Sequence, residues 1–132
     1  MNEKQKHCTE ILENKENSFV QKDVIGSLRK SQVRQWIEQN KPYATSFVTE
    51  NQSKQLQAAI LGVCFYMSSR TTLPTAPELA QGNSLFRRGE DSEIAQLVTV
   101  MEQEGLSDVV LKGTSYSIMQ LKALREALMV RS

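Results

Sequence analysis

Residues 58–67 form the longest apolar run in the sequence, and they constrain the fold more than any other segment. A helix that is hydrophobic nearly all round is typical of a central, buried position. The run is far shorter than the roughly 20 residues that a membrane-spanning helix requires. Thr49 and Gln52 precede it at the spacing of a capping box, in which each side chain satisfies the other's backbone N–H. We therefore predict a buried core helix from Thr49 to about Ser69.

The sequence ahead of this helix predicts further helices and a short strand. Thr9 is placed to cap a short, mostly exposed helix. Apolar residues recur at spacings of three and four over residues 19–40, which predicts one bent helix or two short ones. Lys41 closes this stretch, because Pro42 disfavours a helical conformation in the residue before it. Residues 43–47 then alternate β-forming and small side chains, which predicts a short strand.

Beyond residue 70 the sequence predicts two short, well-capped helices. Thr75 is expected to cap a helix over residues 76–81, whose early proline is tolerated in the first turn. Asp91 or Ser92 is expected to cap the next helix, and Gly105 to end it in a left-handed conformation. The core face of that second helix follows the helical period and comprises Ile94, Leu97, Val98 and Met101.

The last part of the chain predicts a hairpin followed by an amphipathic helix. Two β-prone stretches flank a lysine–glycine pair within residues 108–116, which indicates a hairpin. Ser117 and Gln120 repeat the capping-box spacing at the start of the final helix. Its predicted apolar face comprises Ile118, Leu121, Leu124 and Leu128. The predicted fold class is mainly α with a small β-hairpin.

The composition is ordinary for a globular domain, with 39% hydrophobic and 23% charged residues and a net charge of +1. It argues against wholesale disorder, and against strong electrostatic capture of nucleic acid or an anionic membrane by the whole chain. The first residues lack the apolar core of a signal peptide. With only two cysteines, the expected setting is the reducing cytoplasm, without membrane contact.

No residue pattern in the sequence predicts catalysis, a metal or a cofactor. The sole histidine, His7, stands beside Cys8, but no second pair of ligands completes a tetrahedral site. Cys64 lies in the apolar run and is expected to be a small buried hydrophobe. There is no glycine-rich phosphate loop, and the acidic residues are scattered. We therefore expect a non-enzymatic protein.

The order of the predicted elements resembles that of winged helix-turn-helix proteins. Residues 75–80 (TAPELA) are similar to that family's second helix, and residues 97–106 (LVTVMEQEGL) resemble the end of its recognition helix. Residues 109–118 would then be the wing. The resemblance implies a winged-helix-like domain over residues 49–132 with a helical N-terminal segment over residues 1–48. It implies a small transcription regulator that binds double-stranded DNA as a homodimer, joined through its N-terminal or final helix.

The resemblance also implies which side chains would contact DNA. In this family the recognition helix reads base edges and the wing touches phosphates, so Arg87, Arg88 and Lys112 are the first candidates. A second basic region, over residues 22–41, carries a net charge of about +3. The interpretation that we prefer for that region is an ordinary solvated helix face with Trp36 in the core. The candidates on this second surface are Arg29, Lys30 and Arg34.

DNA binding is the first hypothesis from the sequence, but the charges near the predicted recognition helix count against it. Residues 55–132 contain seven basic and eight acidic side chains, and acidic groups are repelled by phosphates. The competing hypothesis is a protein-interaction module, such as an adaptor, inhibitor or assembly subunit, without nucleic-acid binding. A contiguous basic face would favour DNA, whereas an apolar patch around Trp36, Phe47 or Leu128 would favour a protein. The residues expected to be exposed on the predicted recognition helix are Glu90, Glu93, Gln96, Val100 and Gln103.

Overall fold

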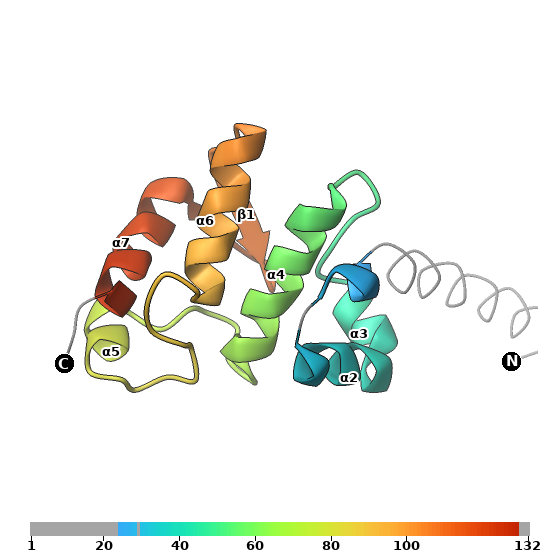
Figure 1. The fold of residues 1–132 in the computed structure, drawn as a ribbon, viewed down its shortest axis with the longest axis horizontal. Coiled ribbons are helices and arrows are strands. Elements are labelled where there is room, and N and C mark those ends of the chain that lie inside the picture. Colours follow the sequence, from blue (N-terminus) through green and yellow to red (C-terminus); the bar gives the residue numbers. More distant parts are fainter. Residues whose placement is uncertain (1–23, 29, 130–132) are drawn as a thin grey trace, which may run out of the picture.

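The computed structural model describes residues 24–28 and 30–129, so the helix predicted at Thr9 lies outside the described residues. The elements in chain order are η2 (Ile25–Ser27), α2 (Ser31–Gln39), α3 (Lys41–Thr45), α4 (Lys54–Met67), α5 (Ala76–Ala80), α6 (Glu93–Glu104), β1 (Asp108–Leu111), β2 (Thr114–Ser117) and α7 (Ile118–Met129). Figure 1 shows α4 near the middle, with α2 and α3 on one side and α5, α6 and α7 on the other. The predicted class, mainly helical with a small hairpin, is confirmed.

α4 is the central helix, and it packs most extensively against α6. Five consecutive residues, 60–64, are buried, which confirms the prediction of a buried core helix. The helix begins later than predicted, because Ser53 is the N-cap and its Oγ accepts the Leu56 N–H at 3.0 Å. The Gln52 side chain does accept the Thr49 N–H at 2.9 Å. That pair closes the turn ahead of the helix, so the predicted start at Thr49 is wrong.

The segment ahead of α4 contains a helix where a strand was predicted. Leu28 is extended between η2 and α2, so the described part of the long helical stretch consists of two short pieces. Residues 43–47 do not form a strand, because α3 begins just before them. Pro42 stands in the first turn of α3, where its missing N–H costs no helical hydrogen bond. The rings of Tyr43 and Phe47, four residues apart, pack edge to face with their centroids 4.7 Å apart.

The capping signals of the C-terminal half are confirmed. Thr75 and Glu78 form a capping box, with N–H to side-chain distances of 3.3 and 3.2 Å. Ser92, rather than Asp91, caps α6, and its Oγ accepts the N–H three residues later at 3.1 Å. Gly105 ends α6 with a φ of 69°, a conformation that costs other residues free energy. Local hydrogen bonds therefore fix the ends of both helices.

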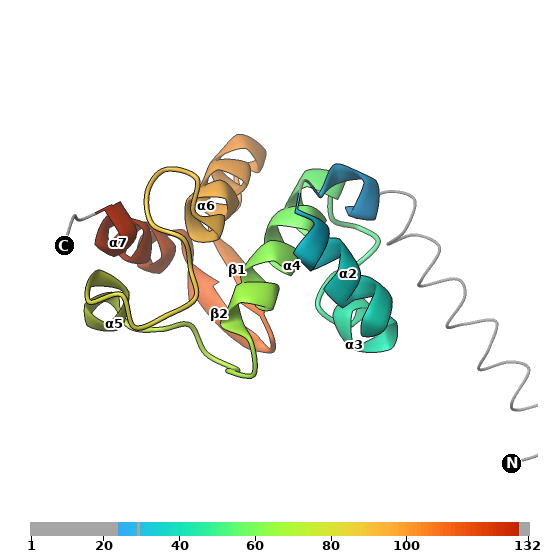
Figure 2. The same cartoon turned by 60° about the horizontal axis from the view of Figure 1, so that its bottom comes forward.

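The hairpin is antiparallel, with Val109 opposite Tyr116. Its two turn residues, Lys112 and Gly113, have φ values of 50° and 86°, as a type I′ turn requires. Val109 and Leu111 are buried, so one face of β1 belongs to the core. Figure 2 shows the hairpin between α4 and α7, and it contacts both helices.

One hydrophobic core joins the N-terminal helices to the rest of the described chain. Val33 and Ile37 of α2 belong to the same buried cluster as Ile60 of α4. The division at residues 48 and 49 stays a prediction. No helix within residues 24–28 and 30–129 has the length and apolar character needed to cross a membrane. The predicted core face of α6 is fully buried, and it comprises Ile94, Leu97, Val98 and Met101.

Candidate functional site

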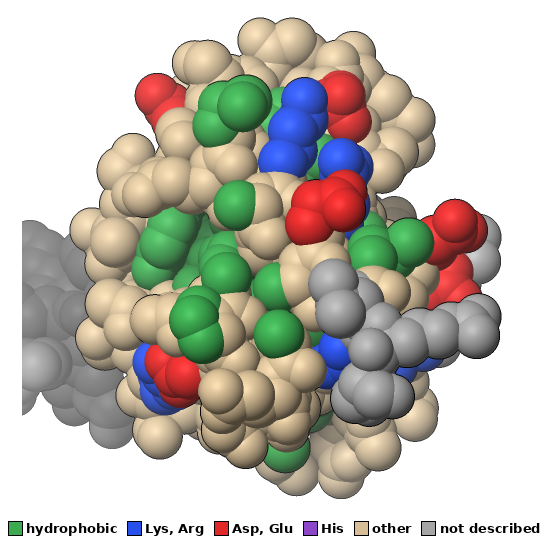
Figure 3. Space-filling model, turned by 90° about the vertical axis from the view of Figure 1, so that its left-hand side faces the viewer, with side chains coloured by type: hydrophobic (Ala, Val, Ile, Leu, Met, Phe, Trp, Pro, Cys, Tyr) green, Lys and Arg blue, Asp and Glu red, His purple; other side chains and the backbone are tan. Residues whose placement is uncertain are grey.

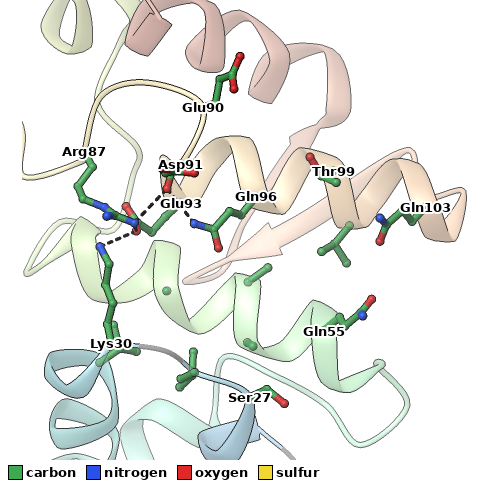
Figure 4. A pocket seen from close by; sticks show the side chains of 16 residues that line it. Ser27, Lys30, Gln55, Arg87, Glu90, Asp91, Glu93, Gln96, Thr99 and Gln103 are labelled. Atoms are coloured by element: carbon green, nitrogen blue, oxygen red, sulfur yellow. Dashed lines mark hydrogen bonds and ion pairs between the residues drawn. The ribbon is translucent and has the colours of Figure 1, made fainter.

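A half-enclosed groove of about 730 Å³ runs along α4 and α6, and we call it the α4–α6 groove (Figure 4). Ser27, Leu28, Lys30 and Val33, from the segment ahead of α4, line its third side. A volume of this size falls within the range of known ligand pockets. The groove is therefore built from segments that are far apart in the sequence.

The floor of the groove is made by small residues of α4. Ala58, Ala59 and Gly62 stand at helical spacing, so they share one face of the helix. Leu28 and Val33 add buried apolar surface from the neighbouring segment. Because these α4 side chains are short, a ligand's backbone or side chains can approach the helix closely. The floor offers apolar contact and little polar chemistry.

The wall of the groove is the solvent face of α6, and its side chains are mostly uncharged hydrogen-bonding groups. Gln96, Thr99 and Gln103 are exposed and Val100 is half-buried. The predicted exposure of the two glutamines is confirmed. The amide of Gln96 donates to the backbone carbonyl of Asp91 at 2.8 Å, which holds this side chain along the start of the helix. The wall can therefore offer hydrogen bonds to a ligand in the groove.

Glu93, the first residue of α6, is the buried charge of the groove. It is only 6% exposed, and its Oε2 accepts hydrogen bonds from Lys30 Nζ at 3.1 Å and Arg87 Nη2 at 3.3 Å. Lys30 also donates to the Tyr66 hydroxyl at 2.9 Å and lies over the same ring. The positive end of the α6 dipole and the two cations together offset the cost of burying the carboxylate.

The other carboxylate oxygen of Glu93, Oε1, is buried and has no hydrogen-bond partner within the described part of the chain. A buried acceptor without a partner lowers the free energy of unfolding by roughly 1–3 kcal/mol, and such groups are rare in folded proteins. The predicted exposure of Glu93 is wrong. A Cβ added to Gly62 would lie 3.6 Å from its Cγ, so α4 covers this side chain from below. Helical periodicity within α6 carries no information about a cover supplied by another helix.

Two of the predicted DNA contacts, Lys30 and Arg87, meet at Glu93. The sequence placed them on separate surfaces, but the structure brings them to one carboxylate (Figure 4). Their side chains remain 28% and 45% exposed, respectively. Arg87 also donates to the backbone carbonyl of Asp91 at 3.1 Å. Both cations are thus held by internal acceptors, which lowers what they offer to phosphates.

Arg88 and Lys112 are likewise turned toward backbone carbonyls. Arg88 Nη1 donates to the carbonyl of Leu79 at 2.7 Å, near the end of α5. Lys112 Nζ donates to the carbonyls of Ser68 and Arg70, the latter at 3.2 Å. Burial lowers the pKa of Lys112. Lys112 therefore ties the hairpin turn to the end of α4, a structural role that the sequence did not reveal.

The remaining basic candidates are Arg34 and Arg29. Arg34 is exposed on α2, and Arg29 lies outside the described residues. Figure 3 shows one face of the molecule, on which acidic side chains lie beside the basic ones and hydrophobic side chains are scattered between them. The ion pair between Arg70 and Glu78, at 2.9 Å, is one of several mixed-charge contacts among the described residues. That face has no surface of a single charge sign.

The exposed apolar surface does not centre on Leu128. This residue is buried, in agreement with its place on the predicted apolar face of the final helix, so it contributes to no surface patch. Trp36 and Phe47 are half-buried, and exposed Tyr43 packs edge to face against both rings. Other large exposed hydrophobic side chains in the described residues lie on the α5–α6 connector, the hairpin and α7. They are Leu85, Val110, Met119 and Met129.

The described residues contain no group of three or more histidine, cysteine, aspartate or glutamate side chains placed to hold a metal. His7 and Cys8 lie outside them. Cys64 is buried, and burial raises the pKa of its thiol to about 12. This thiol is therefore not a nucleophile near neutral pH.

Comparison of the chain with protein-family models, with curated proteins and with solved structures found no match. The features of the described chain that bear on function are the α4–α6 groove and the buried carboxylate within it.

Proposed function

We propose that this chain is a non-enzymatic protein-interaction module that holds a segment of a partner protein in the α4–α6 groove. The observation that carries the proposal is the groove itself, with an apolar floor and a wall of uncharged hydrogen-bonding side chains. Grooves between helices bind peptides by covering apolar side chains while the rim satisfies polar groups. The volume of about 730 Å³ suits a short segment rather than a whole domain.

The positions of the basic side chains support a protein partner over DNA. Arg87 and Lys30 share the carboxylate of Glu93, while Arg88 and Lys112 donate to backbone carbonyls. A phosphate would have to compete with these acceptors for each cation. Affinity for DNA rests largely on phosphate neutralisation, so each of these cations would contribute less to it than a cation without an internal acceptor.

Peptide display against the immobilised full chain tests the proposal. Enriched peptides should bind the wild-type protein and lose about tenfold or more in affinity for Thr99→Trp, because an indole on the exposed wall occupies the groove. Glu126→Trp is the matched control, since Glu126 is exposed on α7 and does not line the groove. Failure to enrich any peptide, or equal binding to Thr99→Trp and wild type, would contradict the proposal.

A second candidate function is DNA binding by a winged-helix-type regulator. The order α4, α5, α6, hairpin, α7 favours it, and the exposed α6 face offers Gln96 and Gln103, whose amides can read adenine. Fluorescence anisotropy with duplex DNA at low and moderate salt tests this function. Salt-dependent binding that falls on changing Arg87 and Arg88 to alanine would support it and would displace the first proposal. Light scattering on the same samples tests the predicted homodimer.

A further inference from the structure

We infer that the α4–α6 groove selects peptide segments carrying an arginine or lysine side chain, and that this cation docks on Glu93. The inference rests on the proposed function and adds the chemistry of the partner. It commits to a basic segment of another protein as the occupant.

The charges that line the groove are unequal. Three carboxylates, Glu90, Asp91 and Glu93, line it together with two cations, Lys30 and Arg87, which leaves one negative charge in excess. Figure 4 shows Lys30, Arg87, Asp91 and Glu93 close together at the start of α6, whereas the Glu90 side chain points away from them. A ligand cation would restore neutrality there, whereas a ligand anion would add to the imbalance.

The acceptor for that cation is already in place. Glu93 lines the groove, is 6% exposed, and keeps Oε1 buried without a partner among the described residues. Guanidinium and ammonium groups donate several hydrogen bonds and pair strongly with a partly buried carboxylate. Oε1 has no exposed surface, so a ligand donor reaches this carboxylate only by taking the place of Lys30 or Arg87 at Oε2, and a bidentate guanidinium there would satisfy Oε1 as well.

Access to Glu93 requires one side chain to move. Lys30 is 28% exposed, and its ammonium can keep the Tyr66 hydroxyl as a partner when it leaves the carboxylate. Arg87 is 45% exposed and can turn toward water. The ligand cation therefore exchanges with Lys30 or Arg87 at Glu93, and no uncompensated charge is buried.

The rest of the groove suits the remainder of such a segment. The small floor residues Ala58, Ala59 and Gly62 admit the aliphatic stem of a lysine or arginine, which packs along apolar surface while its charge reaches a polar group. Gln96 and Gln103 stand where they can bond the ligand backbone. The groove thus selects for one positive charge in the ligand, and its other contacts do not depend on the ligand's sequence.

The test begins with the peptides enriched on the full chain. Enriched sequences should share a central arginine or lysine. A synthetic peptide from this set should bind about tenfold more tightly than its Arg→Gln counterpart, as measured by fluorescence anisotropy. Glu93→Gln should reduce that ratio to about twofold or less. Glu126→Gln, an exposed change on α7, should leave the ratio unchanged.

A second variant avoids dependence on a buried position. Thr99→Arg places a large, positively charged side chain on the exposed groove wall, so it should weaken both peptides by its size and weaken the arginine peptide more than the Arg→Gln peptide by its charge. Thermal unfolding checks that each variant is folded. Equal affinities for the two peptides, with both lost on Thr99→Trp, would overturn the charge inference while the proposed function stands.

Other occupants of the groove give distinct results. A photo-crosslinker introduced at Gln103 of the full chain should link to the arginine peptide. Crosslinking to residues 1–23 of the same chain, or to a second copy, that the peptide does not displace would overturn the inference. Duplex DNA that binds in the groove and displaces the peptide would overturn both the inference and the proposed function.

Discussion

Replacing Glu93 with glutamine tests whether this carboxylate is the buried anchor of the groove. The change keeps the shape of the side chain but removes the charge that accepts from Lys30 at 3.1 Å and Arg87 at 3.3 Å. A buried hydrogen bond to a charged group contributes roughly 1.5–3 kcal/mol. Since both cations are partly exposed and can turn to water, each contact is worth closer to the surface value of about 1 kcal/mol or less.

The expected loss in the free energy of unfolding is therefore about 1–2 kcal/mol, which lowers Tm by roughly 3–8 °C for a domain of this size. Urea unfolding of the full chain, followed by circular dichroism, measures it. Glu90→Gln is the matched control, because Glu90 is exposed in the same groove, and its change should stay within about 0.5 kcal/mol. An unfolding midpoint of Glu93→Gln equal to that of the wild type would show that Glu93 is solvated, and would refute the reasoning.

Three further predictions concern the core and the surface. Gly62→Ala should raise the free energy of unfolding by about 0.5–1 kcal/mol in urea titrations, because glycine destabilises a helix interior. The added Cβ would lie 3.6 Å from the Cγ of Glu93, an ordinary contact distance. A loss of stability would show that the site has no room for the methyl group. In a Cys8→Ser background, Cys64 should react with a thiol reagent at pH 8 only after unfolding, since burial raises its pKa to about 12; fast native labelling would contradict its burial. The hydrogen bond from Arg70 lowers the pKa of Glu78 to about 2, so this pair stabilises the fold above the ordinary carboxylate range and the contribution is lost as pH falls toward 2. Arg70→Met should return the Glu78 titration toward its ordinary value in carboxylate NMR, and an unchanged titration would disprove the pairing.

Local signals in the sequence located most of the C-terminal elements. Each of these signals acts within a few residues, as with the capping box of Thr75 and Glu78 or the left-handed glycine at Gly105. The same kind of signal failed where two local solutions compete. Residues 43–47 alternate like a strand, but Pro42 can also start a helix, and the edge-to-face packing of Tyr43 and Phe47 belongs to the helical arrangement.

Most of the candidate site could not be predicted from the sequence. Gln96 and Gln103 could be placed on the exposed face of α6 from periodicity alone. The contact between Lys30 and Glu93 could not be predicted, because the two residues are 63 positions apart and no local pattern marks the contact. Lys112 looked like a phosphate contact on a hairpin tip, yet its ammonium is held by carbonyls at the end of α4.

The sequence by itself determined where helices and turns begin and end, because caps, glycines and apolar periodicity act over one or two helical turns. Only the tertiary structure decided which charged groups are paired and which surfaces stay open. Burial of Glu93 depends on α4, which packs against it, and on two cations: Lys30, 63 residues away, and Arg87 in the loop that leads into α6. Side-chain solvation and charge pairing are set by elements that lie far apart in the sequence and meet only in the fold, and the α4–α6 groove depends on both.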